Sequence, residues 1–186
     1  MPITRDEAVE LLDKYIKNEK MKNHCYATEA VMRALARRLG RDEEKWAIAG
    51  LLHDLDIELV NGDLNIHGSK TEKILNEKGV EKDIVDAIIM HNETLTGKKR
   101  QSEFEHALAA GETITGLIIA TALVYPQKKI ASVKPKSVIK RMKEKAFAAS
   151  VNRDNIMECE VIGLSLNEFV DISLDAMKDI GDKLGL

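Results

Sequence analysis

The chain has 186 residues, a net charge of −3, 44% hydrophobic residues and 32% charged residues. This length fits a single domain, and this composition excludes a disordered chain. The negative net charge argues against a protein that is basic throughout and coats nucleic acid. The 2 cysteines form no C-x-x-C pair and hence no disulfide framework. We expect both to be buried thiols, although Cys25 adjoins a histidine and could be an exposed thiol near a site.

The sequence shows no targeting or membrane-spanning segment. Residues Met1–Glu7 contain no apolar segment, so no signal peptide is predicted. The most apolar stretch, Ile114–Tyr125, is about half the length that a bilayer span needs. We therefore expect a cytoplasmic protein without a membrane partner.

Hydrophobic periodicity predicts an all-α fold of about eight helices, and no segment shows convincing strand alternation. Thr4–Glu7 form a capping box for the first helix, and a charged break follows at Lys17–Lys22. Gly40 ends the second helix and Asp42 caps the third. The helices are expected over residues 4–16, 23–39, 42–54, 67–79, 81–91, 103–125, 154–161 and 166–184.

Two segments between these helices read as loops. Leu55–Ile66 contains the turn signal Asn61-Gly62-Asp63, and Thr94–Arg100 is polar throughout. We expect their shapes to decide which substrate the protein accepts.

Four of the five histidines fall at expected helix ends or turns: His24, His53, His67 and His91. A single histidine at such a place usually caps a helix or makes a hydrogen bond. Asp54 follows His53 directly, however, and converging helix ends can place several imidazoles around one cleft. Because neighbouring helix residues diverge by about 100°, His53 and Asp54 can share a cation only where the helix ends.

These residues resemble a known family. The order His24, then His53-Asp54, then an acidic residue far downstream is similar to the H…HD…D pattern of the HD superfamily of metal-dependent phosphohydrolases. The resemblance covers about residues 20–125 and implies one HD-like helical domain over 1–186, with a helical extension at 126–186. Further segments that resemble the family are Trp46–Leu52, His67-Gly68 and Ile88–His91.

The resemblance implies a metal site formed by His24, His53, Asp54 and Glu112. Glu112 stands where the family carries its last aspartate. The glutamate is one methylene longer but is still an oxygen donor, so coordination stays feasible. The metal could be Mn, Fe, Co, Ni, Zn or Mg.

The resemblance also assigns catalytic roles to Asp54, His67 and His91. Asp54 would orient a water, and the two histidines would contact phosphate, donate a proton or bind a second metal. Asn92 follows His91 where some two-metal relatives have another histidine, which favours about one metal per chain. His106 has no matching role and is expected at the surface.

Three charged residues near these histidines have open roles. Lys70 lies one turn beyond His67 and either contacts phosphate or faces solvent. Asp56 and Glu58 strengthen the acidic field, and they either cap the loop or bind a second cation through water. We assign neither a direct ligand role.

A basic tract, Lys128–Lys145, contains eight Lys or Arg residues and one Glu. We favour a solvated helix face with a stripe that faces the core. The alternatives are an electropositive wall that attracts an anionic substrate, or a nucleic-acid contact. Aromatic residues do not alternate with the charges, which argues against stacking on single-stranded bases.

The sequence therefore predicts an enzyme, a metal-dependent phosphohydrolase that acts on a nucleotide or a small phosphate ester. The alternative is a non-enzymatic HD-like domain that binds a ligand or nucleotide through a weakened metal site. Nucleic acid is the less favoured partner, and the oligomeric state is open.

Overall fold

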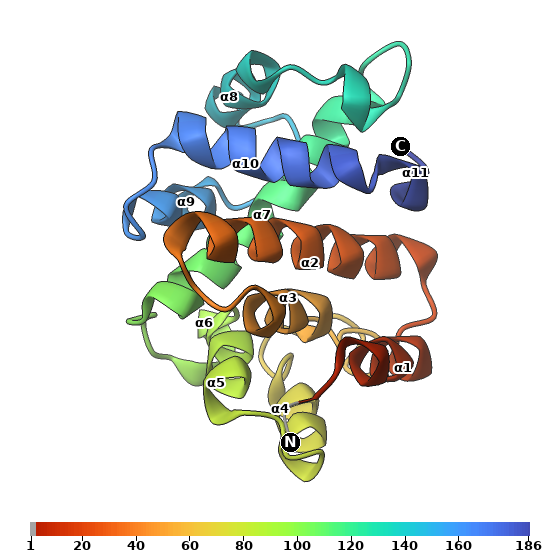
Figure 1. The fold of residues 1–186 in the computed structure, drawn as a ribbon, viewed down its shortest axis with the longest axis vertical. Helices are drawn as coiled ribbons and strands as arrows, with labels where there is room; N and C mark the ends of the chain where they lie inside the picture. Colours follow the sequence, from red (N-terminus) through yellow and green to blue (C-terminus); the bar gives the residue numbers. More distant parts are fainter. Residues whose placement is uncertain (1–2) are drawn as a thin grey trace.

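The computed structural model describes residues 3–186, and these residues form helices and connecting turns without any strand (Figure 1). The prediction of an all-α fold is confirmed. Eleven α-helices replace the expected eight or so, because helices also form at residues 93–96 and 135–143 and because the expected helix 166–184 is divided in two. They are α1 (Arg5–Tyr15), α2 (Glu19–Leu39), α3 (Glu43–Leu52), α4 (Ser69–Glu77), α5 (Lys82–Met90), α6 (Glu93–Thr96), α7 (Glu103–Leu123), α8 (Pro135–Lys143), α9 (Arg153–Met157), α10 (Leu166–Asp179) and α11 (Gly181–Leu184).

The helix α2 is the centre of the packing. It lies between α3 and α10, and α7 crosses these helices and contacts each of them (Figure 1). One face of α2 is buried through most of its length, with Val31, Met32 and Leu35 fully inside the core. This arrangement places residues near the start of α2 beside the end of α3.

Gly50 allows α2 and α3 to approach closely. A Cβ atom at this position would lie 2.7 Å from the backbone oxygen of Thr28, which is shorter than any ordinary contact. Only glycine lets two helix backbones meet at this separation. The close approach brings His24 of α2 next to His53, the residue that caps the end of α3.

Local signals explain most helix ends. The Thr4–Glu7 capping box is present, Gly40 ends α2 in the left-handed conformation, and Asp42 caps α3. The expected charged break at Lys17–Lys22 is wrong, because the Asn18 side chain accepts hydrogen bonds from the backbone at residues 20 and 21 and starts α2 at Glu19. The helix therefore begins about one turn before the predicted start.

The two expected loops differ in structure. Leu55–Ile66 contains only turns, as predicted, with positive φ angles of 51° at Asn61 and 70° at Gly62. Thr94–Arg100 is not entirely irregular, because its first residues belong to α6, which the Asn92 side chain caps.

The helix α7 is the most apolar element. By length and composition alone it could cross a membrane, and 67% of its most apolar window is buried inside the fold. Its apolar part is longer than the Ile114–Tyr125 stretch seen in the sequence. Both cysteines are buried as predicted, and the alternative of an exposed Cys25 thiol is wrong. Burial raises the pKa of Cys159 to about 11.

We predict that Gly50→Ala destabilises the protein by about 1–3 kcal/mol, because the new methyl group collides with the Thr28 backbone. Urea unfolding measures the change. Gly116→Ala is the control, since its Cβ would meet only a side-chain methyl at 3.4 Å and the substitution favours the helix. Equal unfolding midpoints for both variants would contradict the close approach of α2 and α3.

Candidate metal centre

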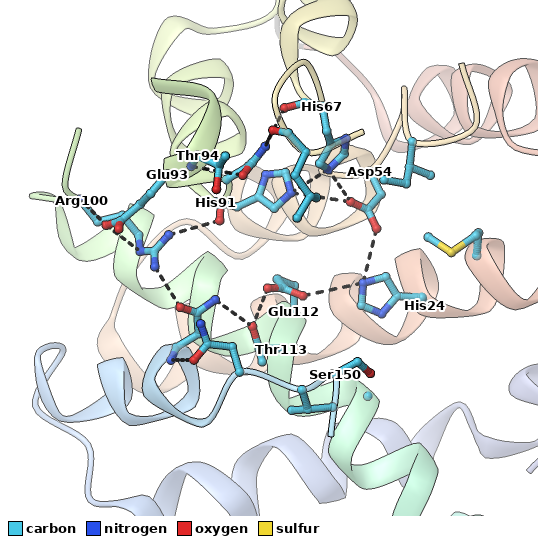
Figure 2. A pocket seen from close by; sticks show the side chains of 18 residues that line it. His24, Asp54, His67, His91, Glu93, Thr94, Arg100, Glu112, Thr113 and Ser150 are labelled. Carbon is cyan, nitrogen blue, oxygen red and sulfur yellow. Dashed lines mark hydrogen bonds and ion pairs between the residues drawn. The ribbon is translucent and has the colours of Figure 1, made fainter. Parts of the chain in front are cut away.

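A cavity of about 820 Å³ opens among the ends of α2, α3, α5 and the middle of α7. His24, Asp54, His67, His91 and Glu112 all line it, although 88 residues separate the first from the last in the sequence (Figure 2). The chain therefore brings the predicted site residues to one place, with His53 buried beneath the others.

The four predicted metal ligands form one group. The Nε2 atoms of His24 and His53 lie 3.1 Å apart, and Asp54 Oδ2 lies 3.6 Å from the first and 3.4 Å from the second. Glu112 points toward His24, with Oε2 3.9 Å from its Nε2 atom (Figure 2). Ligand atoms that each sit about 2.1 Å from one ion are separated by similar distances.

A second group lies on the other side of Asp54. Its Oδ1 atom is 3.0 Å from His67 Nε2 and 3.6 Å from His91 Nε2, and these two nitrogens are 3.0 Å apart. Each group offers three or more ligand atoms within 4.8 Å of one another. Asp54 directs one oxygen to each group, so the geometry offers two cation positions where the sequence favoured one.

Two imidazoles of the first group are held by bonds from their Nδ1 atoms. His53 Nδ1 donates to the Gly50 carbonyl at 2.8 Å. The Thr115 hydroxyl donates its hydrogen to the Glu112 backbone carbonyl at 2.7 Å. It must therefore accept from His24, whose Nδ1 donates to it at 2.9 Å. A proton on Nδ1 leaves a lone pair on Nε2, directed at the cluster.

The second group is held in the same way. His67 Nδ1 donates to Asp56 Oδ1 at 2.8 Å, and His91 Nδ1 donates to the Ile88 carbonyl. Such outer bonds set the tautomer and orientation of metal-binding histidines in general. In total, four Nε2 atoms face one another and two carboxylates.

This donor set fits divalent metal ions. Two neutral Nε2 atoms cannot hydrogen-bond to each other, so contacts of 3.0–3.1 Å require a proton or a cation between the groups. Mixed imidazole and carboxylate ligands suit Mn, Fe, Co, Ni and Zn. His53 and His91 also cap the carboxyl ends of α3 and α5, whose partial negative charge favours a cation.

The pKa values show where protons go when no cation is bound. Burial lowers the pKa of His24 to about 4, assisted by the neighbouring His53. Burial also acts to lower the pKa of His67, but its bonds to Asp54 and Asp56 outweigh burial and raise it to about 9. Burial raises the pKa of Glu112, whereas histidine contacts hold that of Asp54 well below its usual value despite burial.

Asp56 positions His67 and also caps α4. Its carboxylate accepts hydrogen bonds from the backbone of Gly68 at 3.0 Å, Lys70 at 2.9 Å and Thr71 at 3.2 Å. The capping alternative for Asp56 is therefore the one that the structure shows. The same carboxylate accepts the bond that orients His67, so Asp56 links the start of α4 to the histidine cluster.

Other charged residues considered in the sequence lie outside the cluster. Lys70 bonds to the Leu59 carbonyl at 2.9 Å and does not line the cavity, which favours its solvent-facing alternative. Glu58 accepts bonds from the backbone at Lys17 and Asn18 and holds the junction of α1 and α2. His106 is not a surface residue as expected, because it is partly buried and its Nδ1 lies 2.7 Å from Glu158.

The basic tract packs as a helix with an apolar stripe. Ile130, Val133 and Val138 are buried against α7 and α10, and the basic side chains of α8 lie on the other face. None of the residues 128–145 lines the cavity, so the electropositive wall is wrong for this pocket.

Sequence reasoning missed a hydrogen-bond chain that reaches Glu112 from the carboxyl-terminal extension. The Asn155 amide donates to the Thr113 hydroxyl at 3.4 Å, and this hydroxyl donates to Glu112 Oε1 (Figure 2). Arg100 holds the Asn155 oxygen at 3.0 Å and Glu158 at 2.7 Å. Nothing in the local sequence marks Asn155, since only folding brings it to α7.

A family model for the HD domain matches residues 21–123. Because this match covers more than half of the chain, the protein belongs to the HD-domain family. In the same comparisons no curated protein and no solved structure matched the chain. The matched region contains both ligand groups, whereas Asn155 and Glu158 lie beyond it.

We predict that the metal-stripped protein loses stability as pH rises from about 6.5 to 9. The folded state holds a proton on His67 up to about 9, above the ordinary 6.5, so this stabilisation is complete below 6.5 and disappears through 9. His24 has the opposite sign, and its lowered pKa removes stability as pH falls from 6.5 toward 4. Thermal unfolding of the wild type and of His67→Gln measures both slopes. Burial acts to lower the pKa of His53, but Asp54 outweighs this effect and raises that pKa as well, so His67→Gln should lose only part of the alkaline slope. An alkaline slope as steep in His67→Gln as in the wild type would contradict this assignment.

We predict that the reloaded wild type binds two divalent ions per chain. Replacing His24 or His91 by alanine should leave one ion, and Asp54→Asn should weaken both positions, because each group shares this carboxylate. Elemental analysis after gel filtration measures the content, and His106→Ala is a matched histidine control outside both groups. If the wild type binds one ion per chain and His91→Ala binds the same number, the result would instead support phosphate or proton contacts for His67 and His91.

Proposed function

We propose that the protein is a metal-dependent phosphohydrolase that acts on a nucleotide or a small phosphate ester. The observation that carries this proposal is the position of Asp54 at the wall of an 820 Å³ cavity, with Oδ2 toward His24 and His53 and Oδ1 toward His67 and His91. Membership of the HD-domain family supports it. The cytoplasmic location stays a prediction.

The chain's own residues would hold and orient the reacting groups. His24, His53, Asp54 and Glu112 would bind one ion, and Asp54, His67 and His91 the other. Bound divalent ions supply positive charge against phosphoryl oxygens and acidify water. In the overall reaction a water oxygen bonds to phosphorus, the ester P–O bond breaks, and the departing oxygen takes up a proton.

Asp54 is suited to its proposed role because it stays ionised. Its pKa lies well below the ordinary value, so the carboxylate can accept hydrogen bonds and attract cations throughout the neutral range. The outer bonds that His53 and His67 donate to Gly50 and Asp56 would prevent these imidazoles from rotating during the reaction. Preorganised charge of this kind is a major source of rate acceleration in enzymes.

The non-enzymatic alternative drew on two residues, Glu112 and Asn92. Glu112 faces the cluster, where its longer side chain still reaches toward His24. The Asn92 amide donates to the carbonyls of Leu64 at 2.7 Å and His67 at 3.0 Å and so anchors the loop above the site. This structural role explains the asparagine at position 92, so the residue is no longer an argument for an inactive protein. The observations therefore favour the enzyme.

We predict that His53→Ala and Asp54→Ala each lower phosphate release by at least about 100-fold, because each removes a proposed ligand of the reacting centre. A panel of phosphate esters assayed with Mn²⁺, Co²⁺ and Zn²⁺ measures the activity, and circular dichroism checks that the fold is kept. Lys136→Ala is the control on the exposed face of α8. Tight nucleotide binding without turnover under any metal would select the binding-domain alternative.

A further inference from the structure

The cavity wall contains very little free positive charge. Three carboxylates line it, those of Asp54, Glu93 and Glu112, whereas Arg100 is its one basic side chain among residues 3–186, apart from the histidines of the cluster. No lysine of the described chain lines it. Arg100 therefore decides whether the wall can offer a cation to a second phosphate group.

Every donor of Arg100 already has an acceptor. Its Nε bonds to Glu158 at 2.8 Å, and Nη1 bonds to the carbonyls of Met90 at 2.9 Å and His91 at 3.1 Å. Its Nη2 bonds to Asn155 at 3.0 Å and Glu158 at 2.7 Å, as the dashed lines at Arg100 partly show (Figure 2). A guanidinium has five N–H donors, so none remains for a ligand. The side chain is only 5% exposed, and its role is to join the His91 turn to α9.

Glu93 is the one carboxylate of the cavity wall, among the described residues, that belongs to neither ligand group. Glu93 accepts bonds from the Lys99 ammonium at 2.6 Å and from the Arg100 backbone at 3.1 Å, and Lys99 does not line the cavity. Each phosphate carries a charge of about −1.5 to −2 when it is terminal. A phosphate group placed beyond the metal centre would meet no free cation of the wall, and an unpaired charge in a partly closed cavity is costly.

The remainder of the wall is uncharged. The Ser150 hydroxyl and the Asn152 amide nitrogen make no hydrogen bond within residues 3–186, and they lie at the rim of the cavity with Thr94. Apolar surface comes from Met21, Ile57, Leu64 and Val151. Hydroxyl and amide groups beside apolar side chains suit an organic group with polar edges, and cavities of 300–1,000 Å³ hold molecules of about nucleoside size or larger.

Arg153 holds this uncharged wall in place. Its guanidinium lies inside the turn before α9 and donates to the carbonyls of Ala148 at 2.7 Å and Val151 at 2.8 Å, and also to that of Phe147. These bonds fix the segment that presents Ser150 and Asn152 to the cavity. The wall is therefore preformed, and its uncharged groups can meet a ligand without any rearrangement of the chain.

We propose that the cavity selects phosphomonoesters, which carry a single phosphoryl group on an uncharged organic part of up to nucleoside size, and that it discriminates against di- and triphosphates. This proposal rests on the proposed function and specifies its substrate class. The metal centre would neutralise one phosphoryl group, and the wall at Ser150–Asn155 would contact the uncharged part. Hydrolysis would release inorganic phosphate and an alcohol.

The test compares adenosine mono-, di- and triphosphate on the full-length, metal-loaded protein at a fixed, saturating concentration of free metal. Both binding, by displacement of inorganic phosphate, and phosphate release are measured. We expect the monophosphate to bind at least about 10-fold more tightly than the other two, and its kcat/KM to exceed theirs. Equal or tighter binding of the triphosphate would overturn the proposal.

A gain-of-charge variant makes the test specific to the wall. Ser150→Lys adds a free cation to the cavity and should shift the ratio of diphosphate to monophosphate affinity at least about 10-fold toward the diphosphate. Asn76→Lys adds the same charge on the exposed face of α4, outside the cavity, and should leave this ratio unchanged. An unchanged ratio in Ser150→Lys would overturn the proposal.

The binding measurement separates this proposal from the proposed function. Monophosphate preference and a shifted ratio in Ser150→Lys, without turnover of any ester, would support the charge selection and reject the hydrolase. Turnover that is fastest with the triphosphate would keep the hydrolase and overturn the charge selection. Absence of binding by all three nucleotides would overturn the selection as well.

Discussion

The site depends on one constraint, the direction of four imidazole lone pairs. Each histidine of the cluster donates its Nδ1 hydrogen outward, to Gly50, Thr115, Asp56 or Ile88, so each Nε2 atom is left facing Asp54 or a neighbouring imidazole. Groups that all offer lone pairs repel one another unless a proton or a cation lies between them. The fold must hold them together against this repulsion, and the buried helices around them do so.

Two of these outer acceptors, Gly50 and Asp56, also fix the positions of the helices around the site. Gly50 allows α2 and α3 to touch, and its carbonyl orients His53, so one residue sets both the distance and the direction of a candidate ligand. Asp56 caps α4 and orients His67. Because the packing and the site share these residues, a change at either position affects stability and chemistry together. Such coupling is typical of bundle sites, where ligands project from rigid helices.

The carboxyl-terminal extension completes the cavity. It lies beyond the region that matches the HD domain, yet Asn155 supports Thr113 and Glu112, and Glu158 anchors Arg100. The donors of Arg100 are all engaged in these structural bonds, and Arg153 donates to carbonyls of the turn that carries Ser150. The extension thus makes a neutral wall from segments that contain basic residues. Basic residues in the sequence therefore do not give this cavity a positive charge that a ligand could use.

Helical periodicity and capping residues determined the all-α fold and most helix ends, because these signals are local. The four predicted metal ligands came from the resemblance of short motifs to the HD superfamily. The start of α2 was missed, since the Asn18 cap was hidden among charged residues. Only the tertiary structure decided that His67 and His91 form a second group on Asp54, that His106 pairs with Glu158 and that Asn155 reaches Glu112. These contacts join helices far apart in the chain, and their geometry follows from packing, which no local pattern records.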